Sequence, residues 1–493
     1  MGFLSQLLMA AAVRSPRTIS GVLAAGVAAI PSAGQAAEWT IIPRATVSSV
    51  FTDNANEARD REDRNSDLLV EASPGVAISG TGGRFSLALN YSHSRFHSFL
   101  GASDESATNS LIANGRMELY DRVAFVDATS SISRQVIDSS EPVSSVDTGS
   151  SQNRTTVQTA SLQPFFLHHF GTWLETESRT TLNVTRSQSD EVSDTRTIGE
   201  SFTFNSGRRF SVFTFSGALT DEKTMRDGDE PSTSQTVAVT NYRLRVMPKL
   251  SLLSSIGWEK IDDPGLNESV NGMTWNVGFA AQPNSRSSIE LTYGREQDAQ
   301  SIDFSANYAL SRRTNISASY SESLTSSARL LNEDLDFVID NGSGVLIDSR
   351  TGQPFDPSAQ NFDFQTSLFR QRVFTVSLAA TRRLVNYAAN VSWERRETDT
   401  TGTEESVTTA DISASRPFNS RLSGTVGTSI SFRDFGTEDA REDRVAAFTA
   451  SLSYLLAQNT FAALSYSWNK TQSTEGANNF HDNTVTLSLT RTF

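Results

Sequence analysis

Apolar and polar residues alternate along residues 483–493, the last stretch of the chain. One parity carries Val485, Leu487, Leu489 and Phe493, and Arg491 is its one break, whereas Thr and Ser fill most of the other. A period of two places successive side chains on opposite faces of a β-strand. About 9 to 11 tilted residues allow such a strand to cross a bilayer. We therefore predict an amphipathic strand that ends on an aromatic residue.

A hairpin further upstream shows the same alternation. Its apolar face consists of Ala446, Phe448, Ala450, Leu452, Tyr454 and Leu456 and, after a turn at Gln458-Asn459, of Ala462, Leu464, Tyr466 and Trp468. The opposite face is mostly Ser and Thr. In a soluble sandwich the apolar face would form the core. In a membrane barrel it would face lipid, and the small polar face would line the lumen.

Connections between the alternating segments are short and long in turn. The short ones are residues 80–83, 120–122, 167–171, 206–208, 247–249, 282–285, 311–313, 381–383, 417–420 and 457–459. The long ones are 52–66, 100–106, 134–154, 188–196, 220–233, 261–270, a tight one near 297, 324–360, 398–406, 434–443 and 471–482. This predicts an all-β fold, a closed antiparallel transmembrane barrel of about 22 strands with short periplasmic turns and long extracellular loops.

Two patterns favour a membrane barrel over soluble sandwiches. The period of two recurs in nearly every segment of residues 37–493, and we find neither a helical period nor interdomain linkers there. The tryptophans fall near predicted strand ends: Trp258, Trp275, Trp393 and Trp468 near the long loops, Trp39 and Trp173 near the other ends. Aromatic girdles of this kind mark both membrane interfaces.

The N-terminus has the pattern of a secretory signal. Arg14 and Arg17 precede an apolar stretch, Ile19 to Ile30, and small residues follow up to Ala36. We predict a signal peptide over 1–36 with cleavage after Ala36. Translation from Met9 would give a signal peptide of more ordinary length. The alternative interpretation of this stretch is a short membrane anchor. The first strand then begins almost at the cleavage site, which leaves no room for the N-terminal plug domain of a TonB-dependent transporter.

Composition narrows the class further. Hydrophobic residues make up 37% of the 493 residues, mean hydropathy is -0.33, and outside the N-terminus no apolar run reaches the length of a transmembrane helix. The chain has no cysteine, which excludes disulfides and thiolate metal sites. The net charge of -14 argues against nucleic acid as a partner.

No catalytic, cofactor or metal site is predicted. His168 and His169 fall in a short turn with no evident carboxylate neighbour, His93 and His97 share an apolar face, and His481 stands beside Asp482. A rim-active enzyme would need a partnered His, which sequence alone does not show. The long loops are acidic, but their carboxylates lack the spacing of a calcium loop. Solvation beside lipopolysaccharide bridged by divalent cations explains them better than a calcium site.

Basic residues gather instead at the short turns. Arg208, Arg209, Lys249, Arg312, Arg313, Arg382 and Arg383 can reach periplasmic headgroups or ring the lower mouth. The predicted luminal parity mixes charges with many Ser, Thr and Asn residues, and it carries no row of Trp or Tyr. This predicts a hydrated lumen without strong ion selectivity.

The chain resembles a known family at its first strands. Trp39-Thr40-Ile41-Ile42-Pro43, then Thr52-Asp53-Asn54 and Pro74-Gly75, is similar to the opening of the outer-membrane barrels associated with PEP-CTERM (exosortase) and exopolysaccharide gene clusters, a group named putative β-barrel porin 2. The C-terminal Phe493 resembles the assembly signal of bacterial outer-membrane barrels.

The resemblance implies a place in the outer membrane of a Gram-negative bacterium, among its lipids and lipopolysaccharide, and contact with the barrel-assembly machinery. It also implies a pore or accessory protein for exopolysaccharide secretion, with the polymer and its export apparatus as partners. It brings no catalytic residues. The alternatives are a non-transporting adhesin or scaffold and, as a third, a rim-active enzyme.

The longest loop, 324–360, contains a candidate constriction. Two apolar triplets, Phe337-Val338-Ile339 and Val345-Leu346-Ile347, flank a turn that includes Asn341 and Gly342, which is a strong hairpin signal. Barrels of about 22 strands are normally plugged. We therefore expect this hairpin to fold over or into the lumen, with an exposed ribbon above the membrane as the alternative.

Overall fold

The computed structural model folds Trp39–Phe493 into long paired strands joined by turns and loops. It describes residues 38–493 except 57, 102, 104, 140, 142–146, 148–152, 190–191, 228–230, 264–265, 267–268, 341–345, 350–354, 356–361, 399–402, 437–440 and 476–478. The predicted signal peptide over 1–36 lies outside the described residues, and so do Asn341, Gly342 and Val345.

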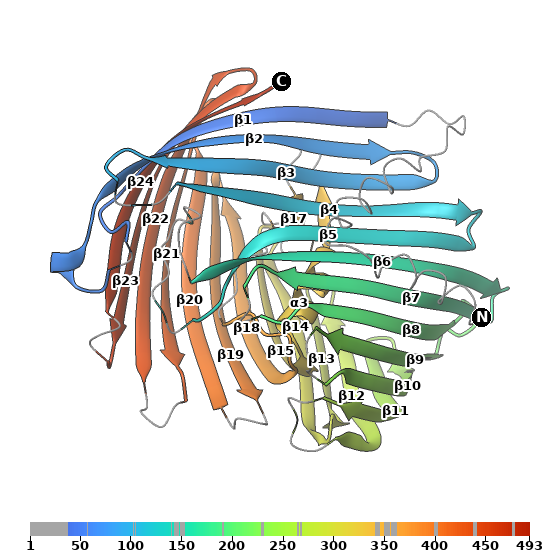
Figure 1. Cartoon of the computed structure of the whole chain (residues 1–493). Coiled ribbons are helices and arrows are strands. Elements are labelled where there is room, and N and C mark those ends of the chain that lie inside the picture. The colour runs from blue at the N-terminus through green and yellow to red at the C-terminus, as the bar shows by residue number, and fades with distance from the viewer. Residues whose placement is uncertain are drawn as a thin grey trace. The chain divides into compact units, whose positions relative to one another are not determined.

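One 22-stranded antiparallel sheet makes up the wall (Figure 1). Its first half is β1 (Glu38–Thr52), β2 (Asp67–Thr81), β3 (Phe85–Ser98), β4 (Ser106–Tyr120), β5 (Ala124–Val136), β6 (Arg154–Phe170), β7 (Leu174–Ser187), β8 (Thr195–Ser206), β9 (Phe213–Arg226), β10 (Thr233–Met247) and β11 (Leu250–Asp262). Its second half is β12 (Val270–Asn284), β13 (Ser287–Glu296), β14 (Ala299–Ser311), β15 (Thr314–Thr325), β18 (Phe369–Arg382), β19 (Val385–Thr398), β20 (Thr403–Pro417), β21 (Leu422–Asp434), β22 (Glu442–Ala457), β23 (Thr460–Ser473) and β24 (Phe480–Thr492).

Pairing of the first strand with the last closes the sheet. β1 and β24 pair in register from Arg44 with Thr492 to Thr52 with Thr484. The Phe493 N–H extends this ladder by donating to the Pro43 carbonyl at 2.9 Å. Closure leaves no open sheet edge, which in a bilayer would leave backbone groups without hydrogen-bond partners. The predicted closed antiparallel barrel and its strand number are confirmed.

The alternation along each strand separates an apolar outer face from a polar inner face. On β24, Leu487 and Leu489 are 56% and 48% exposed, whereas Thr484 is buried. Trp39, Trp173, Trp258 and Trp275 are also exposed, as residues of an interfacial girdle should be. In the part of the chain that the structure describes, no helix is both long and apolar enough to cross a membrane.

The observed connections follow the predicted alternation, but several bounds differ: the longest loop, predicted to end at residue 360, continues to 368, and the turn predicted at 206–208 continues to 212. β6 runs on to Phe170, so His168 and His169 belong to a strand rather than a turn. β9 continues to Arg226, into the predicted loop over 220–233. The expectation of no helical period is wrong, because α3 (Ser327–Leu335) lies in the longest loop.

One tight turn stands on the long-loop side, between β13 and β14. Gln297 and Asp298 connect these strands with φ values of 53° and 58°. Positive φ at both central residues gives the turn the twist that two-residue hairpins favour. The predicted tight connection near residue 297 is therefore confirmed.

Deleting β24 should prevent closure of the barrel. A chain ending at Asn479 would leave β1 and β23 as unpaired edges, which a bilayer does not tolerate. We expect loss of the heat-modifiable gel shift and of outer-membrane protein. Phe493→Tyr, which keeps an aromatic terminus, serves as the control and should assemble normally. Normal assembly without β24 would contradict the closed barrel.

Candidate functional site in the barrel lumen

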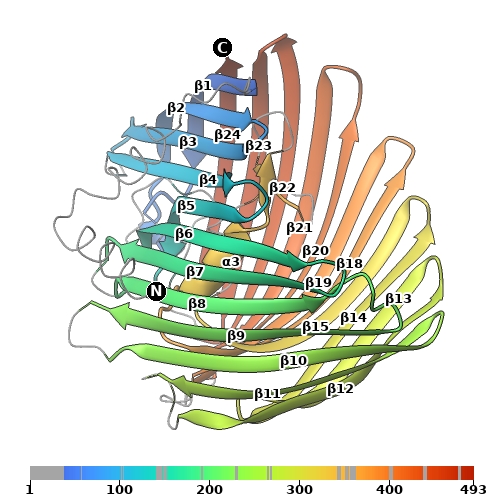
Figure 2. The ribbon, with the colours of Figure 1, turned by 90° about the vertical axis from the view of Figure 1, so that its right-hand side faces the viewer.

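A long segment between β15 and β18 occupies part of the lumen. This inner segment, residues 326–368, contains α3 and a two-stranded sheet of β16 (Val338–Asp340) and β17 (Leu346–Asp348). Figures 1 and 2 show α3 within the ring of strands. The longest connection of the chain therefore folds back into the barrel.

Helix α3 forms because its sequence has a cap and one apolar face. The Ser326 side chain accepts a hydrogen bond from the Arg329 N–H at 3.3 Å, which satisfies a free donor of the first turn. Ala328, Leu331 and Leu335 are buried at spacings of three and four residues, so they share a face. Ala328 and Leu331 pack with Val157 of β6, Val192 and Phe364. The helix thus lies against the wall with its apolar side.

The predicted hairpin residues lie beyond α3. Ile339 pairs with Ile347 in the small sheet. Val338 and Leu346 are buried in a cluster with Leu335 and with Ala88 and Ile112 of the wall. Phe337 and Ile339 are exposed, and Ile347 is half-buried.

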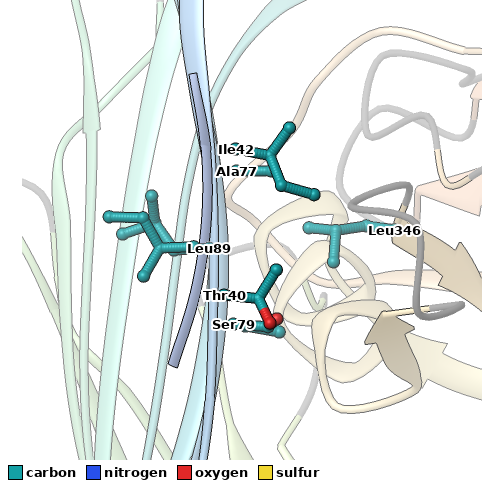
Figure 3. A pocket seen from close by; sticks show the side chains of 8 residues that line it. Thr40, Ile42, Ala77, Ser79, Leu89 and Leu346 are labelled. Atoms are coloured by element: carbon teal, nitrogen blue, oxygen red, sulfur yellow. The ribbon is translucent and has the colours of Figure 1, made fainter. Parts of the chain in front are cut away.

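Leu346 lies near the short-turn end of the barrel. Figure 3 shows its side chain facing Thr40, Ile42, Ala77 and Ser79, whereas Leu89 points to the opposite side of the strands. These residues belong to the start of β1 and the end of β2, which meet at the short-turn end. The inner segment therefore leaves the wall at the long-loop end and extends toward the short-turn end.

The returning part of the inner segment touches another portion of the wall. The Phe364 N–H donates to the Val136 carbonyl of β5 at 3.2 Å. Asp363 accepts a hydrogen bond from the Ser139 N–H, just after β5. Leu368 packs with Ile261, Val270 and Leu324.

Arg396 of β19 holds both arms of the inner segment. Its guanidinium donates to Ser327 Oγ at 3.4 Å and to the Asp363 carbonyl at 3.3 Å. It also lies over the rings of Phe362 and Phe369, at 4.5 and 4.3 Å from their centroids. The side chain is only 7% exposed, and Glu394 lies 3.3 Å away as its ion partner. A buried guanidinium with this many partners fixes the base of the segment.

The contacts of residue 363 therefore connect distant parts of the ring. Arg396 belongs to β19, whereas Ser139 follows β5, and Figure 1 shows these strands on different sides of the barrel. A chain that touches both walls crosses the lumen.

One ion pair and two hydrogen bonds fasten the inner segment to β9 and β10. Arg329 of α3 pairs with Glu222 and donates to Gln235 Oε1 at 3.0 Å. Arg226 pairs with Asp263 at 3.0 Å and donates to the Thr366 carbonyl at 3.2 Å. Arg226 and Asp263 are almost completely shielded from water, so the loss of either would leave the other charge buried.

A charged row on the inner wall lies near the end of α3. Arg116 of β4 and Arg179 of β7 both bond Asp127 of β5, at 2.6 and 3.0 Å. Arg179 also bonds Glu177 at 2.7 Å and lies 4.0 Å from the centre of the Phe165 ring. Because its cations are already paired, this row presents polar but nearly neutral surface to the lumen.

Two carboxyl groups of the inner segment have raised pKa values. Partial desolvation between helix and wall raises the pKa of Glu333, against the attraction of Arg329. The same cause raises the pKa of Asp336, against the attraction of Arg179 and Arg116. Both side chains touch luminal water, but the surrounding wall excludes bulk solvent.

The histidines form no composite centre. His97 lies 2.8 Å from Glu105, and His169 lies 3.0 Å from Glu175, so the expectation that His169 lacks a carboxylate neighbour is wrong. Both pairs are well exposed to water. Among the described residues, no three His, Asp or Glu side chains are placed to hold one metal ion.

Sequence reasoning found the hairpin but missed its fastenings. Arg396 lies on a strand whose alternation shows only a charged luminal residue, and its partners Ser327 and Asp363 are distant in sequence. Helix α3 did leave a signal, since Ser326 precedes apolar residues at 328, 331 and 335. Its nine residues fall inside a long polar loop, where such a pattern is easily overlooked.

Comparison with known proteins agrees with the fold. The family described as "Putative beta-barrel porin 2" matches residues 380–493, which span β19 to β24. Comparison with curated protein sequences gives no match.

Solved outer-membrane receptors are similar in fold. The ferric-catecholate import receptor Fiu from E. coli is 9% identical with a TM-score of 0.53, over 91% of this chain and 81% of that one. The FrpB iron transporter from Neisseria meningitidis (F5-1 variant) is 11% identical with a TM-score of 0.52, over 92% and 82%. A ferric enterobactin receptor variant from Pseudomonas aeruginosa, in complex with enterobactin, is 9% identical with a TM-score of 0.52, over 92% and 81%.

The chain is a porin-like outer-membrane β-barrel. Its closed sheet, its apolar outer face and these similarities place it in the outer membrane of a Gram-negative bacterium. At identities this low the receptors show only a shared fold. The ligands in their names therefore indicate no ligand for this chain.

Arg396→Ala should release the base of the inner segment from the wall. The variant removes two hydrogen bonds from a charged donor and the contact with the Phe362 ring, at a cost of about 3 kcal/mol to the docked state. This corresponds to roughly a hundredfold shift of the docking equilibrium. We expect larger and noisier single-channel conductance in planar bilayers.

Arg95→Ala is the matched control for this variant. Arg95 is 72% exposed and 3.7 Å from Glu105, so its loss should leave conductance unchanged. Equal conductance of R396A and wild type would show that Arg396 does not hold the segment.

Acidic pH should favour the docked inner segment. A carboxyl whose pKa is raised by docking binds its proton more tightly when docked. Protonation therefore stabilises that state as pH falls from neutral toward the ordinary values of 4.5 for Glu333 and 3.8 for Asp336. We expect conductance to fall over this window.

The groups that face these carboxyls define the control. Arg329, Asp334 and Glu222 surround Glu333, and Arg179, Asp127 and Arg116 surround Asp336. E333Q/D336N keeps all of them and mimics the protonated form. It should conduct less at neutral pH and respond less to acid; an unchanged pH profile would exclude these two groups.

Proposed function

We propose that the barrel is an outer-membrane passage for a hydrated exopolysaccharide, kept closed at rest by the inner segment. The observation that carries this proposal is the way the segment crosses the lumen. Hydrogen bonds and ion pairs fix it at a few wall positions, and its apolar clusters are small and separate. When the segment moves, polar contacts of this kind can be replaced by hydrogen bonds to water.

The wall beyond the segment suits a polymer that must slide. Ser423 pairs with Ser453 and Thr425 with Ser451 across β21 and β22. These small hydroxyl side chains offer weak and interchangeable hydrogen bonds to a sugar chain. A row of aromatic rings would instead bind the polymer and slow its release.

The fold and the family match support this role at a coarser level. A porin-like barrel in the outer membrane offers a passage whose contents are set by its lumen. The exopolysaccharide as cargo and an export apparatus as partner are our extension from the resemblance of the first strands. We also propose that the barrel-assembly machinery recognises Phe493, which lies at the exposed end of the β1–β24 seam.

A non-transporting adhesin or scaffold is the second candidate. The observation in its favour is the same inner segment, because a lumen crossed from wall to wall does not need to open. In that case the acidic external loops, rather than the lumen, would carry the function.

Loss of the gene should separate the two candidates. If the barrel passes the polymer, a clean deletion strain should synthesise it but retain more in the periplasm and show less at the surface. Fractionation of polysaccharide from surface and periplasm measures this directly. Unchanged amounts in both fractions, with altered adhesion, would instead support the scaffold.

A shortened inner segment tests the closure separately. Deleting residues 334–356 removes the hairpin while leaving the wall strands intact. The strain should become more sensitive to vancomycin, since a barrel of about 22 strands is wide enough for large solutes. R95A in the same strain is the control, and unaltered sensitivity would mean that another element closes the pore.

A further inference from the structure

A band of cations follows one part of the short-turn rim. This basic arc comprises Arg208, Arg209, Lys249, Arg286, Arg312, Arg313, Arg382, Arg383, Arg416 and Arg421. They lie in or beside the successive short turns between β8 and β21, and Figure 2 follows these hairpins along one side of the ring. The short-turn rim is the periplasmic one in outer-membrane barrels.

The cations of the basic arc are exposed and have no opposite charge beside them. All are exposed to solvent. The short turns of this stretch contain no Asp or Glu, and none of these side chains forms an ion pair with a described carboxylate. Arg209 lies 4.0 Å from the centre of the Trp173 ring, and Lys249 donates to the Pro283 carbonyl at 2.6 Å. These contacts orient the groups but leave their charge uncompensated, in a chain whose net charge is -14.

Adjacent turns of the basic arc are close enough to act together. Their hairpins are hydrogen-bonded to one another through β9 with β10, β11 with β12, β13 with β14, β15 with β18, and β19 with β20. Turns two strands apart are separated by roughly 10 Å. This matches the Debye length of about 10 Å at 0.1 M salt. The fields of neighbouring turns therefore overlap into one positive surface.

The remaining short turns differ. The turn after β2 carries one cation, Arg84, and in the turn after β4 Asp121 stands beside Arg122. Gly171 to Trp173 and Gln458-Asn459 carry no charge. Lipid surrounds a barrel on every side, so contact with anionic headgroups would favour cations around the whole rim. An arc that covers consecutive turns from β8 to β21 and leaves the rest of the rim with little net charge indicates a partner that contacts that part of the rim.

We propose that the basic arc docks an acidic surface of a periplasmic protein beneath the barrel. All but one of the cations are arginines, whose planar guanidinium binds carboxylates in bidentate fashion. A positive arc also raises the rate at which an acidic partner arrives from the periplasm. This inference stands whether the barrel conducts, exports a polymer or serves as a scaffold.

A polyglutamate peptide tests the proposal on the full-length protein. With the barrel in nanodiscs of zwitterionic lipid, a fluorescent peptide of about fifteen Glu residues should bind, and more weakly as salt rises from about 0.05 to about 0.3 M. R312Q/R313Q/R383Q should weaken binding about tenfold or more. The matched rim variant R84Q/R122Q/R491Q should change it by less than about twofold.

Further variants and lipids keep the test decisive. R312K/R313K/R383K retains the charge and should retain most of the binding, and heat-modifiable gel shifts show whether each variant is folded. Equal weakening in both Gln variants would mean diffuse attraction and overturn the proposal. Loss of peptide binding in phosphatidylglycerol nanodiscs, with that lipid retained through the arc cations in native mass spectrometry, would assign the arc to lipid and also overturn it.

Discussion

Backbone hydrogen bonding in lipid is the constraint on which the whole structure depends. A strand inside a bilayer has no water to satisfy its N–H and C=O groups, so every strand must pair on both sides. The β1–β24 seam meets this requirement, because it joins segments more than four hundred positions apart in register. Once the ring is closed, successive side chains along each strand face either lipid or the lumen. The apolar outer face and the polar inner face both follow from closure.

Closure of so many strands creates an interior that side chains of the wall alone do not fill. The longest connection of the chain folds into this interior as a helix and a hairpin, and it contacts the wall at separate places. Arg396, Arg329 and Arg226 fasten the segment toward the long-loop end with hydrogen bonds, and Arg329 adds an ion pair with Glu222. Near the short-turn end the contact is apolar, through Leu346. There the segment also accepts a hydrogen bond from Asn114 at the Val338 carbonyl, so it meets the wall at both ends of the barrel.

Charge is divided between the two ends of the barrel. The described long loops carry carboxylates such as Asp60, Glu62 and Asp63, whereas the basic arc occupies one side of the opposite rim. A single net charge of -14 conceals this division. In the orientation usual for outer-membrane barrels, the long loops face the outside and the short turns face the periplasm. The lumen between them has paired charges, as in the row of Arg116, Asp127 and Arg179.

The sequence by itself determined the strands, their number and their faces, because a period of two and the contrast between short and long turns are local properties. For the same reason it predicted a hairpin in the longest loop, where the structure pairs residues 338–340 with 346–348. Only the tertiary structure decided where that hairpin lies and what holds it. Arg396 meets Ser327 and Asp363 because the ring closes. The alternation along a strand does not show which luminal residues face each other across the barrel. Helix α3 likewise draws its stability from packing on Val157, which lies far away in sequence.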